Sequence, residues 1–381
     1  MCFKDGPGGT IEVFWKLLAW SLNSLAKGIW PSHDYRGVAY PPGSKERARA
    51  GQPLAGGFHC VLVSLVGDMD YFAKFLQLPH WTGAARSCTL CRCSKWGELS
   101  WKDFREVAAW RGMIFTTLTW RDDPDAAKAP IFKALNVSGL TVAPDLMHVK
   151  YLGYQQYFLG SVLYLLCFYI LPGTPLQNLH VVGLHVLKFQ RKYGMQNKVS
   201  ALFFRKLSIF VRKSGFPKMR GKGGQIKSLG PAIGSCWKKH MSPANSTHRR
   251  IALMFKLDQE IEGTLQEYAP EHGFYAVPPA EAQAVRKKQM EFSQLYVQLE
   301  AHFSDEDAPL FNVVSKLHAA AHIFDNAKCL HPFLTWCWKG EDFMQTASTL
   351  LGSCLRARTD AGATIKAGLK YSLAMRLAWG P

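Results

Sequence analysis

The sequence predicts a mainly helical protein that keeps only a small remnant of β-sheet. Apolar residues recur at helical spacing through most of the chain, whereas one β-branched apolar run, FHCVLVSLV at residues 58–66, favours a buried strand. The chain has 381 residues, 48% of them hydrophobic, which is enough to build a core in one large domain or two ordinary ones. We therefore expect helices packed around a short sheet.

The first hundred residues divide into a helix, a loop, a strand and a cysteine-rich turn. Residues 9–28, GTIEVFWKLLAWSLNSLAKG, predict a helix of about five turns that stops at a glycine. A loop rich in proline, glycine and basic residues follows, and the predicted strand then ends at Gly67-Asp68, where it delivers a carboxylate. We expect a helix over residues 69–78 and a turn-rich segment with three cysteines after it.

From Asp103 to the end, nearly every segment predicts a helix. Breaks are expected at Pro172-Gly173, at residues 215–231, near Pro278 and around residues 305–309, because proline and glycine interrupt the helical pattern there. One helix in this part raises a question of its own. Residues 152–171 carry no charged side chain and have about the length that a helix needs to cross a bilayer.

Two interpretations of residues 152–171 are possible. A membrane anchor has the right length, but the stretch contains Gln155, Gln156 and two glycines, and it lacks the flanking Lys/Arg cluster that would orient a span. A buried helix needs only neighbouring helices, and several are predicted. We therefore expect a soluble helical insertion, with a membrane protein anchored by residues 152–171 as an alternative.

The balance of charge suits a partner that is a polyanion, and the alternative is an ordinary soluble basic protein. Lys and Arg number 46 against 28 Asp and Glu, so the formal net charge is +18, and the resulting field attracts nucleic acid or anionic lipid. The stretch VRKSGFPKMRGKGGQIKSLG holds basic residues among glycines and no acidic residue, so it can follow a phosphate backbone without reading bases. The alternative is a solvated surface loop. The candidate nucleic-acid-binding residues are Arg212, Lys213, Lys218, Arg220, Lys222 and Lys227.

Cysteine and histidine spacing predicts a zinc site. Ten cysteines without a preceding secretory signal indicate a reducing compartment, with most thiols free. Cys88-x-x-Cys91 is one half-site, and His318 and His322, four residues apart on a predicted helix, form the other. Together they supply four ligands for a structural zinc ion. Cys93 and His331 rank lower as substitute ligands, and the alternative is two buried thiols with two unrelated histidines.

Two carboxylates could serve phosphoryl-transfer chemistry. Asp68 follows the predicted strand, and Glu341 opens a predicted amphipathic helix over residues 341–356. Carboxylates from a strand end and a helix start can hold a pair of Mg²⁺ ions about 4 Å apart. Asp342 is an alternative to Glu341. Taken singly, Asp68 is equally an ordinary turn aspartate, and the acidic pair an ordinary first-turn charge that suits the helix dipole.

The order of these motifs resembles cut-and-paste DNA transposases, in the branch that contains the CACTA and Transib elements and the antigen-receptor recombinase. The resemblance implies an RNase H-like catalytic core in which Asp68 is the second catalytic acid and Glu341 the third. It implies that the C-x-x-C and H-x3-H pairs form the zinc site of a helical insertion. Asp145-x-x-His148 resembles the D-x-x-H signature that opens the main helix of that insertion.

The resemblance also implies a domain organisation. Residues 1–80 would form a partial RNase H-like core, residues 81–322 a large all-helical insertion, and residues 323–381 the C-terminal helices of the catalytic core. The family's first catalytic aspartate has no counterpart here, because Asp5 and Asp34 lie in loops containing glycine and proline. We therefore expect an N-terminally truncated or decayed copy, and enzymatic activity remains uncertain.

The function expected on this basis is transposase-like DNA binding. If the missing aspartate is supplied, Mg²⁺-dependent DNA cleavage and strand transfer would follow. The main alternative is a catalytically dead, transposon-derived protein that binds zinc and nucleic acid. DNA is the expected partner, a homo-oligomer is possible, and the expected location is the nucleus.

Overall fold

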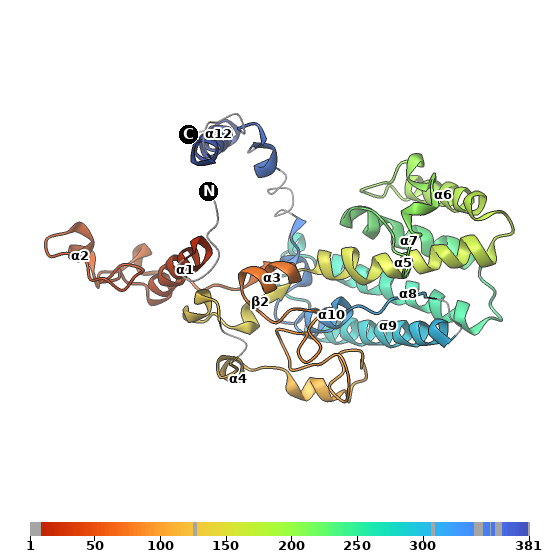
Figure 1. Ribbon diagram of the computed structural model, residues 1–381, viewed down its shortest axis with the longest axis horizontal. Helices are drawn as coiled ribbons and strands as arrows, with labels where there is room; N and C mark the ends of the chain where they lie inside the picture. The colour runs from red at the N-terminus through yellow and green to blue at the C-terminus, as the bar shows by residue number, and fades with distance from the viewer. Residues whose placement is uncertain are drawn as a thin grey trace.

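The computed structural model describes residues 9–124, 128–305, 309–338, 346–350, 352–354 and 360–379. Within these ranges the chain is mainly helical and has one small two-stranded sheet, as the sequence predicts. Figure 1 shows α1 and α2 at one end of the molecule, the long helices α5 to α9 at the other, and α3, β2 and α10 between them.

The α-helices differ widely in length. They are α1 (Thr10–Lys27), α2 (Lys45–Arg49), α3 (Met69–Phe75), α4 (Thr117–Arg121), α5 (Gln155–Leu165), α6 (Pro175–Lys192), α7 (Gly223–His240), α8 (Ser246–Glu267), α9 (Pro279–Asp305), α10 (Ser315–Asp325) and α12 (Asp360–Trp379). The 3₁₀ turns are η1 (Ala55–Gly57), η2 (Ala109–Met113), η3 (Pro130–Lys133), η4 (Gly139–Thr141), η7 (Ala201–Phe204), η8 (Leu207–Ile209), η9 (Pro270–His272) and η10 (Pro332–Thr335). Two π-helical segments, η5 (Met147–Tyr154) and η6 (Leu166–Ile170), flank α5.

The sheet is shorter than predicted. Strand β1 (Leu65–Gly67) pairs in parallel with β2 (Val142–Pro144), with Leu65 opposite Val142. The predicted strand is wrong over residues 58–64, which lie outside any strand, and Phe58 and Val63 are 79% and 70% exposed. A strand needs a neighbour to bond its backbone, and β2 offers only three residues.

The prediction that nearly every segment from Asp103 onward is helical is wrong for residues 103–124 and 128–141. Those described residues contain only α4 and the short turns η2, η3 and η4, because prolines and glycines recur in this part of the chain. Its large side chains are nevertheless buried. Trp110, Trp120 and Phe132 are each no more than 6% exposed, so irregular backbone here still contributes to the core.

Other helices bury most of residues 152–171, although Phe168 and Tyr169 near the end of this stretch are exposed. The end of η5, α5 and η6 lie in the larger of two hydrophobic cores, and α7 packs against all three of these segments. No helix in the described ranges is long and apolar enough to cross a membrane. The lack of charge in this stretch is therefore explained by burial against protein.

Helix α7 shows packing overriding local propensity. The predicted break at residues 215–231 is wrong from Gly223 onward, because α7 continues through Pro231. Its inner face buries Ile226, Ile233 and Trp237. A Cβ on Gly234 would stand 2.8 Å from the Phe255 ring, so the glycine lets α8 approach closely. Burial of this face outweighs the usual cost of glycine and proline in a helix.

Candidate metal centre

The four predicted zinc ligands come together in one buried cluster. The ligand atoms of Cys88, Cys91, His318 and His322 all lie within 4.8 Å of one another. Cys91 Sγ lies 3.3 Å from His318 Nε2, and the two Nε2 atoms lie 3.1 Å apart. In a tetrahedral zinc site the usual bond lengths place two nitrogens about 3.3 Å apart and a nitrogen and a sulfur about 3.6 Å apart. The residues therefore lie close enough to bind a metal such as zinc, as their spacing predicts.

Backbone hydrogen bonds shape the turn that carries the two thiols. The Leu90 N–H donates to Cys88 Sγ at 3.3 Å. The Arg92 N–H donates to the Met113 carbonyl at 3.1 Å, and the Phe115 N–H donates to the Leu90 carbonyl at 3.0 Å. These two bonds fix the position of the C-x-x-C turn against the segment at 113–115.

Helix α10 presents the two imidazoles from one face. His318 and His322 are one turn apart, and each is only 2% exposed. The Trp110 ring meets both edge-on, with centroids 4.4 Å and 5.4 Å away. A cavity of about 20 Å³ lies against Cys88, His318 and His322, which is room for a single ion or water but not for an organic ligand.

The electrostatics favour the metal-binding form of Cys88 and of His318. Burial acts to raise the pKa of the Cys88 thiol, yet hydrogen bonds with Cys91 and Cys93 and the nearby His322 hold it well below its usual value. Burial lowers the pKa of His318, so its imidazole stays neutral. A thiolate and a neutral imidazole are the protonation states that zinc requires. Burial and the neighbouring thiols of Cys88 and Cys93 instead raise the pKa of Cys91, so a bound ion would have to displace its proton.

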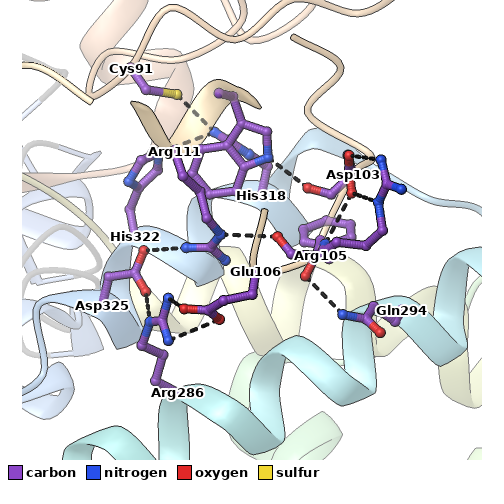
Figure 2. Close-up of polar contacts among 12 residues, drawn as sticks. Cys91, Asp103, Arg105, Glu106, Arg111, Arg286, Gln294, His318, His322 and Asp325 are labelled. Carbon is purple, nitrogen blue, oxygen red and sulfur yellow. Dashed lines mark hydrogen bonds and ion pairs between the residues drawn. The ribbon is translucent and has the colours of Figure 1, made fainter. Parts of the chain in front are cut away.

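An ion-pair network fixes α10 beneath the cluster (Figure 2). Asp325, at the end of α10, accepts from Arg111 at 3.1 Å and from Arg286 of α9 at 2.6 Å. Arg286 also pairs with Glu106 at 2.8 Å. The Arg111 guanidinium lies 4.5 Å from the Trp110 ring centroid, so the network reaches the ring that covers the histidines.

The lower-ranked ligands fall in different places. Cys93 is fully buried and interacts with the thiols of Cys88 and Cys91, so it lies beside the cluster. His331 instead caps η10, where its Nδ1 accepts from the Phe333 N–H at 3.0 Å. Within the described residues, the metal-binding group comprises the four predicted ligands.

Asp68 and Asp145 meet at one edge of the sheet. Each directly follows a strand, and the Asp145 N–H donates to the Gly67 carbonyl at 3.2 Å. Asp68 caps α3 by accepting from the Tyr71 N–H at 2.6 Å. Glu341 and Asp342 lie outside the described residues, so the predicted approach of Asp68 to Glu341 stays a prediction.

The D-x-x-H motif forms a buried clamp. One Asp145 oxygen accepts from the Met147 N–H at 2.9 Å and from the Cys337 N–H at 3.0 Å, and the other bonds to His148 Nδ1. Asp145 is 1% exposed. The motif thereby fixes the start of η5 to the segment that follows η10.

The chain matches no family model, no curated protein and no solved structure. The resemblance to cut-and-paste transposases therefore rests on the motifs and their order in the sequence. The meeting of Cys88 and Cys91 with His318 and His322 shows a group that could hold a metal ion, and by itself it does not point to a family.

The predicted basic loop contains two kinds of residue. Arg212, Lys213, Arg220 and Lys222 are exposed. Lys218 is turned inward, with its Nζ 4.9 Å from the centroid of the Tyr157 ring, and burial lowers its pKa, as does the charge of Arg212. Lys227 is also held in place, because it pairs with Glu262 at 3.4 Å and lies 5.1 Å from the Trp336 ring centroid.

The segregation of charge is a feature that motif reasoning missed. Residues 146–257 contain 18 of the 46 Lys and Arg residues and none of the 28 Asp and Glu residues. The rest of the chain holds 28 of each sign, so this segment accounts for the whole net charge of +18. Among its bases, the described part of the chain shows ion pairs for Lys150, Lys227 and Lys256 alone. A windowed count of acidic residues along the sequence would have found it.

Proposed function

We propose that the chain is a transposase-like DNA-binding protein whose helical insertion is held by a structural zinc ion. The observation that carries the proposal is the acid-free segment, residues 146–257, which supplies the entire net charge. Nucleic acid is the polyanion that such a segment suits, because each neutralised phosphate releases a counterion and strengthens binding. An RNase H-like core is part of the same proposal, supported by the parallel strands that bring Asp68 and Asp145 together.

The basic loop is shaped to present its charges. The Lys218 N–H donates to the Phe210 carbonyl at 2.8 Å, and the Arg220 N–H donates to the Ile209 carbonyl at 2.7 Å. These two bonds close a turn that leaves Arg212 and Lys213 in solvent, with Arg220 beside its base. Exposed guanidinium and ammonium groups on a closed turn suit contacts with phosphates, which position a protein on DNA without specifying sequence.

Zinc would have a mechanical role in this proposal. Cys88, Cys91, His318 and His322 would hold the ion, which when bound supplies a four-coordinate crosslink rather than a reactive group. The crosslink would fix the turn after β1 and α3 to α10. Trp110 excludes water from the histidines, as a closed structural site requires.

DNA cleavage and strand transfer form the further part of the proposal. They would need Asp68, either Glu341 or Asp342, a further catalytic aspartate and Mg²⁺. Asp145 is already bonded by three donors, so we assign it to the clamp rather than to a metal. A homo-oligomer and a nuclear location are the corresponding predictions for assembly and compartment.

The first prediction tests DNA binding. A variant with Arg212, Lys213, Arg220 and Lys222 changed to Gln should bind a fluorescently labelled DNA duplex at least about tenfold more weakly in anisotropy titrations. The slope of log affinity against log salt should fall by up to about 3.6 if all four residues contact phosphates.

The matched control removes the same charge elsewhere. Arg36, Lys45, Arg47 and Arg49 are exposed residues of the N-terminal part, and changing them to Gln should leave both affinity and slope close to wild type. Equal weakening of the two variants would show only a general charge effect and would contradict the assignment of the loop.

A further inference from the structure

A groove of about 510 Å³ lies between α6 and α7, away from the metal cluster and the basic loop. The two helices pack antiparallel, because His185 Nε2 lies 3.2 Å from Ser235 Oγ while Gln190, further along α6, donates to Ser228 Oγ, earlier on α7, at 2.7 Å. Figure 1 shows α6 at the outer edge of the helical end of the molecule. The described chain therefore forms the groove with two helices and leaves its outer side open.

The α6 side of the groove carries exposed apolar side chains. Leu184 is 69% exposed and Val181 48%, although both are large aliphatic residues on a regular helix. The Phe189 and Tyr193 rings pack in a tilted arrangement with centroids 4.5 Å apart and line the groove at the C-terminal end of α6. Aliphatic and aromatic side chains gathered in one open groove are typical of a binding surface rather than of scattered surface residues.

The groove is also lined by basic side chains. Lys188 and Lys192 follow Val181 and Leu184 at intervals of three or four residues, so all four lie on one face of α6. Lys239 and His240 line the groove from the C-terminal end of α7. Neither helix contains an acidic residue, and the described residues show no ion pair for Lys188, Lys192 or Lys239.

We propose that this groove, lined by Val181, Leu184, Lys188, Phe189, Lys192 and Lys239, binds an amphipathic helix of a partner protein whose apolar stripe is flanked by Asp and Glu. The face from Val181 to Lys192 runs for about 16 Å, which a helix of about three turns matches. The apolar stripe would cover Leu184 and Val181, and its carboxylates would pair with the lysines at either end. Lys188, Lys192 and Lys239 belong to the acid-free segment, but the groove would bind such a helix whether or not that segment also binds DNA.

Charge and apolar exposure together favour a helix over nucleic acid as the occupant. A phosphate backbone would pair with the lysines, but it would leave Leu184 and Val181 facing charged oxygens with no apolar contact. An acidic amphipathic helix would pair its carboxylates with the lysines and cover Leu184 and Val181 with its apolar side chains. Arg212 and Lys213 of the basic loop do not line this groove, so its exposed apolar side chains are not part of the proposed DNA contact.

The second prediction tests this partner class. A phage-displayed library of helical peptides, randomised at apolar and charged positions, is selected on the full-length protein. Enriched peptides should carry apolar residues at helical spacing with Asp or Glu on either side, and the tightest should be measured by anisotropy. Leu184→Gln and the double variant Lys188→Glu/Lys239→Glu should each bind that peptide at least tenfold more weakly.

Matched controls lie outside the groove. Leu202→Gln alters a leucine that is 59% exposed, and Arg205→Glu/Lys206→Glu makes the same change of charge at exposed positions. Both should bind the peptide as wild type does, and all variants should share the wild-type melting temperature. Enrichment of basic peptides, or equal binding by groove and control variants, would overturn the proposal. Loss of DNA affinity in Leu184→Gln, with peptide and DNA competing, would instead assign the groove to nucleic acid.

Discussion

Lys150 carries a full charge into a part of the molecule that is closed to water. It is 0% exposed, and its ammonium pairs with Asp258 at 2.8 Å and with Glu262, to which the Tyr151 hydroxyl also donates at 2.7 Å. Gln155 donates to the second Asp258 oxygen at 2.9 Å. A buried charge is tolerated only when it is paired and hydrogen-bonded in this way. The group thereby fixes η5 and α5 to α8.

The third prediction concerns the pH dependence of this group. Burial acts to raise the pKa of Glu262, but the charges of Lys150 and Lys227 and the hydrogen bonds from Lys150 and Tyr151 together outweigh it and lower that pKa to about 2. The folded pKa lies below the unfolded value of about 4.3, so the stabilisation is present above that pH and is lost as the pH falls toward 2. Glu262→Gln should lower the free energy of unfolding by at most about 3 kcal/mol at neutral pH.

Chemical denaturation at a series of pH values provides the measurement. The gap between wild type and Glu262→Gln should narrow as the pH falls below about 4.3. Glu267→Gln, at an exposed position on the same helix, should cost little at any pH. A gap that stays constant down to pH 3 would show that the side chain acts by packing alone.

The residues differ in how far sequence could predict them. Cys88, Cys91, His318 and His322 were predictable because each pair carries its spacing locally, and one chemistry explains both pairs. The partners of Lys150 were not, because Glu262 lies 112 residues away and neither residue belongs to a local pattern. Long-range pairing of single charges leaves no signal in one sequence.

At the scale of elements, a close approach of backbone to backbone places the basic loop. A Cβ on Gly160 of α5 would stand 2.9 Å from the Lys218 nitrogen and from the Pro217 carbonyl. The Met219 N–H donates to the Gln156 carbonyl at 2.8 Å, one turn earlier on the same helix. The loop is therefore seated on α5 at a position where only glycine leaves enough room.

The fourth prediction follows from that contact. Gly160→Ala should displace the loop, weaken binding to duplex DNA several-fold and lower the free energy of unfolding by about 1–3 kcal/mol. Gly263→Ala is the control, because nothing lies within 4 Å of its Cβ position on α8. That variant should be neutral or more stable by up to about 1 kcal/mol, with unchanged DNA binding. Unchanged DNA affinity in Gly160→Ala would separate the loop from the DNA contact.

Elements with a strong apolar period were the predictable ones. Helix α1 matches its predicted span within a residue at each end, and the break between η6 and α6 falls at the predicted Pro172-Gly173. Residues 58–64 have the composition of a strand, yet the described chain pairs only the three residues that follow. Pairing is a property of the neighbouring strand, so composition alone cannot establish it.

At the scale of the whole molecule, the metal cluster joins segments that are far apart in the chain. Cys91 and His318 are separated by 227 residues, and the intervening chain includes the whole acid-free segment. A crosslink across a loop of that length restricts the unfolded chain, and the chain-entropy relation for such a loop gives about 5 kcal/mol. A bound ion would thus connect the turn after α3 to α10, and the stability of the fold would depend on that ion.

The fifth prediction is that zinc sets the melting temperature. Protein purified under reducing conditions should contain about one zinc per chain, and a chelator should lower the melting temperature by about 6 °C, because each kcal/mol shifts the melting temperature of a chain of this length by about 1.2 °C. Added Zn²⁺ should restore the melting temperature, whereas Mg²⁺ should not, since thiolate and imidazole ligands discriminate against Mg²⁺.

Cys88→Ser/Cys91→Ser should melt at the lower temperature with or without chelator, while Cys60→Ser/Cys329→Ser, at exposed positions, should behave as wild type. A chelator that leaves the melting temperature unchanged, or a double Cys88/Cys91 variant that retains its zinc, would show that the cluster is packed thiol and imidazole and that the molecule is closed by its hydrophobic core instead.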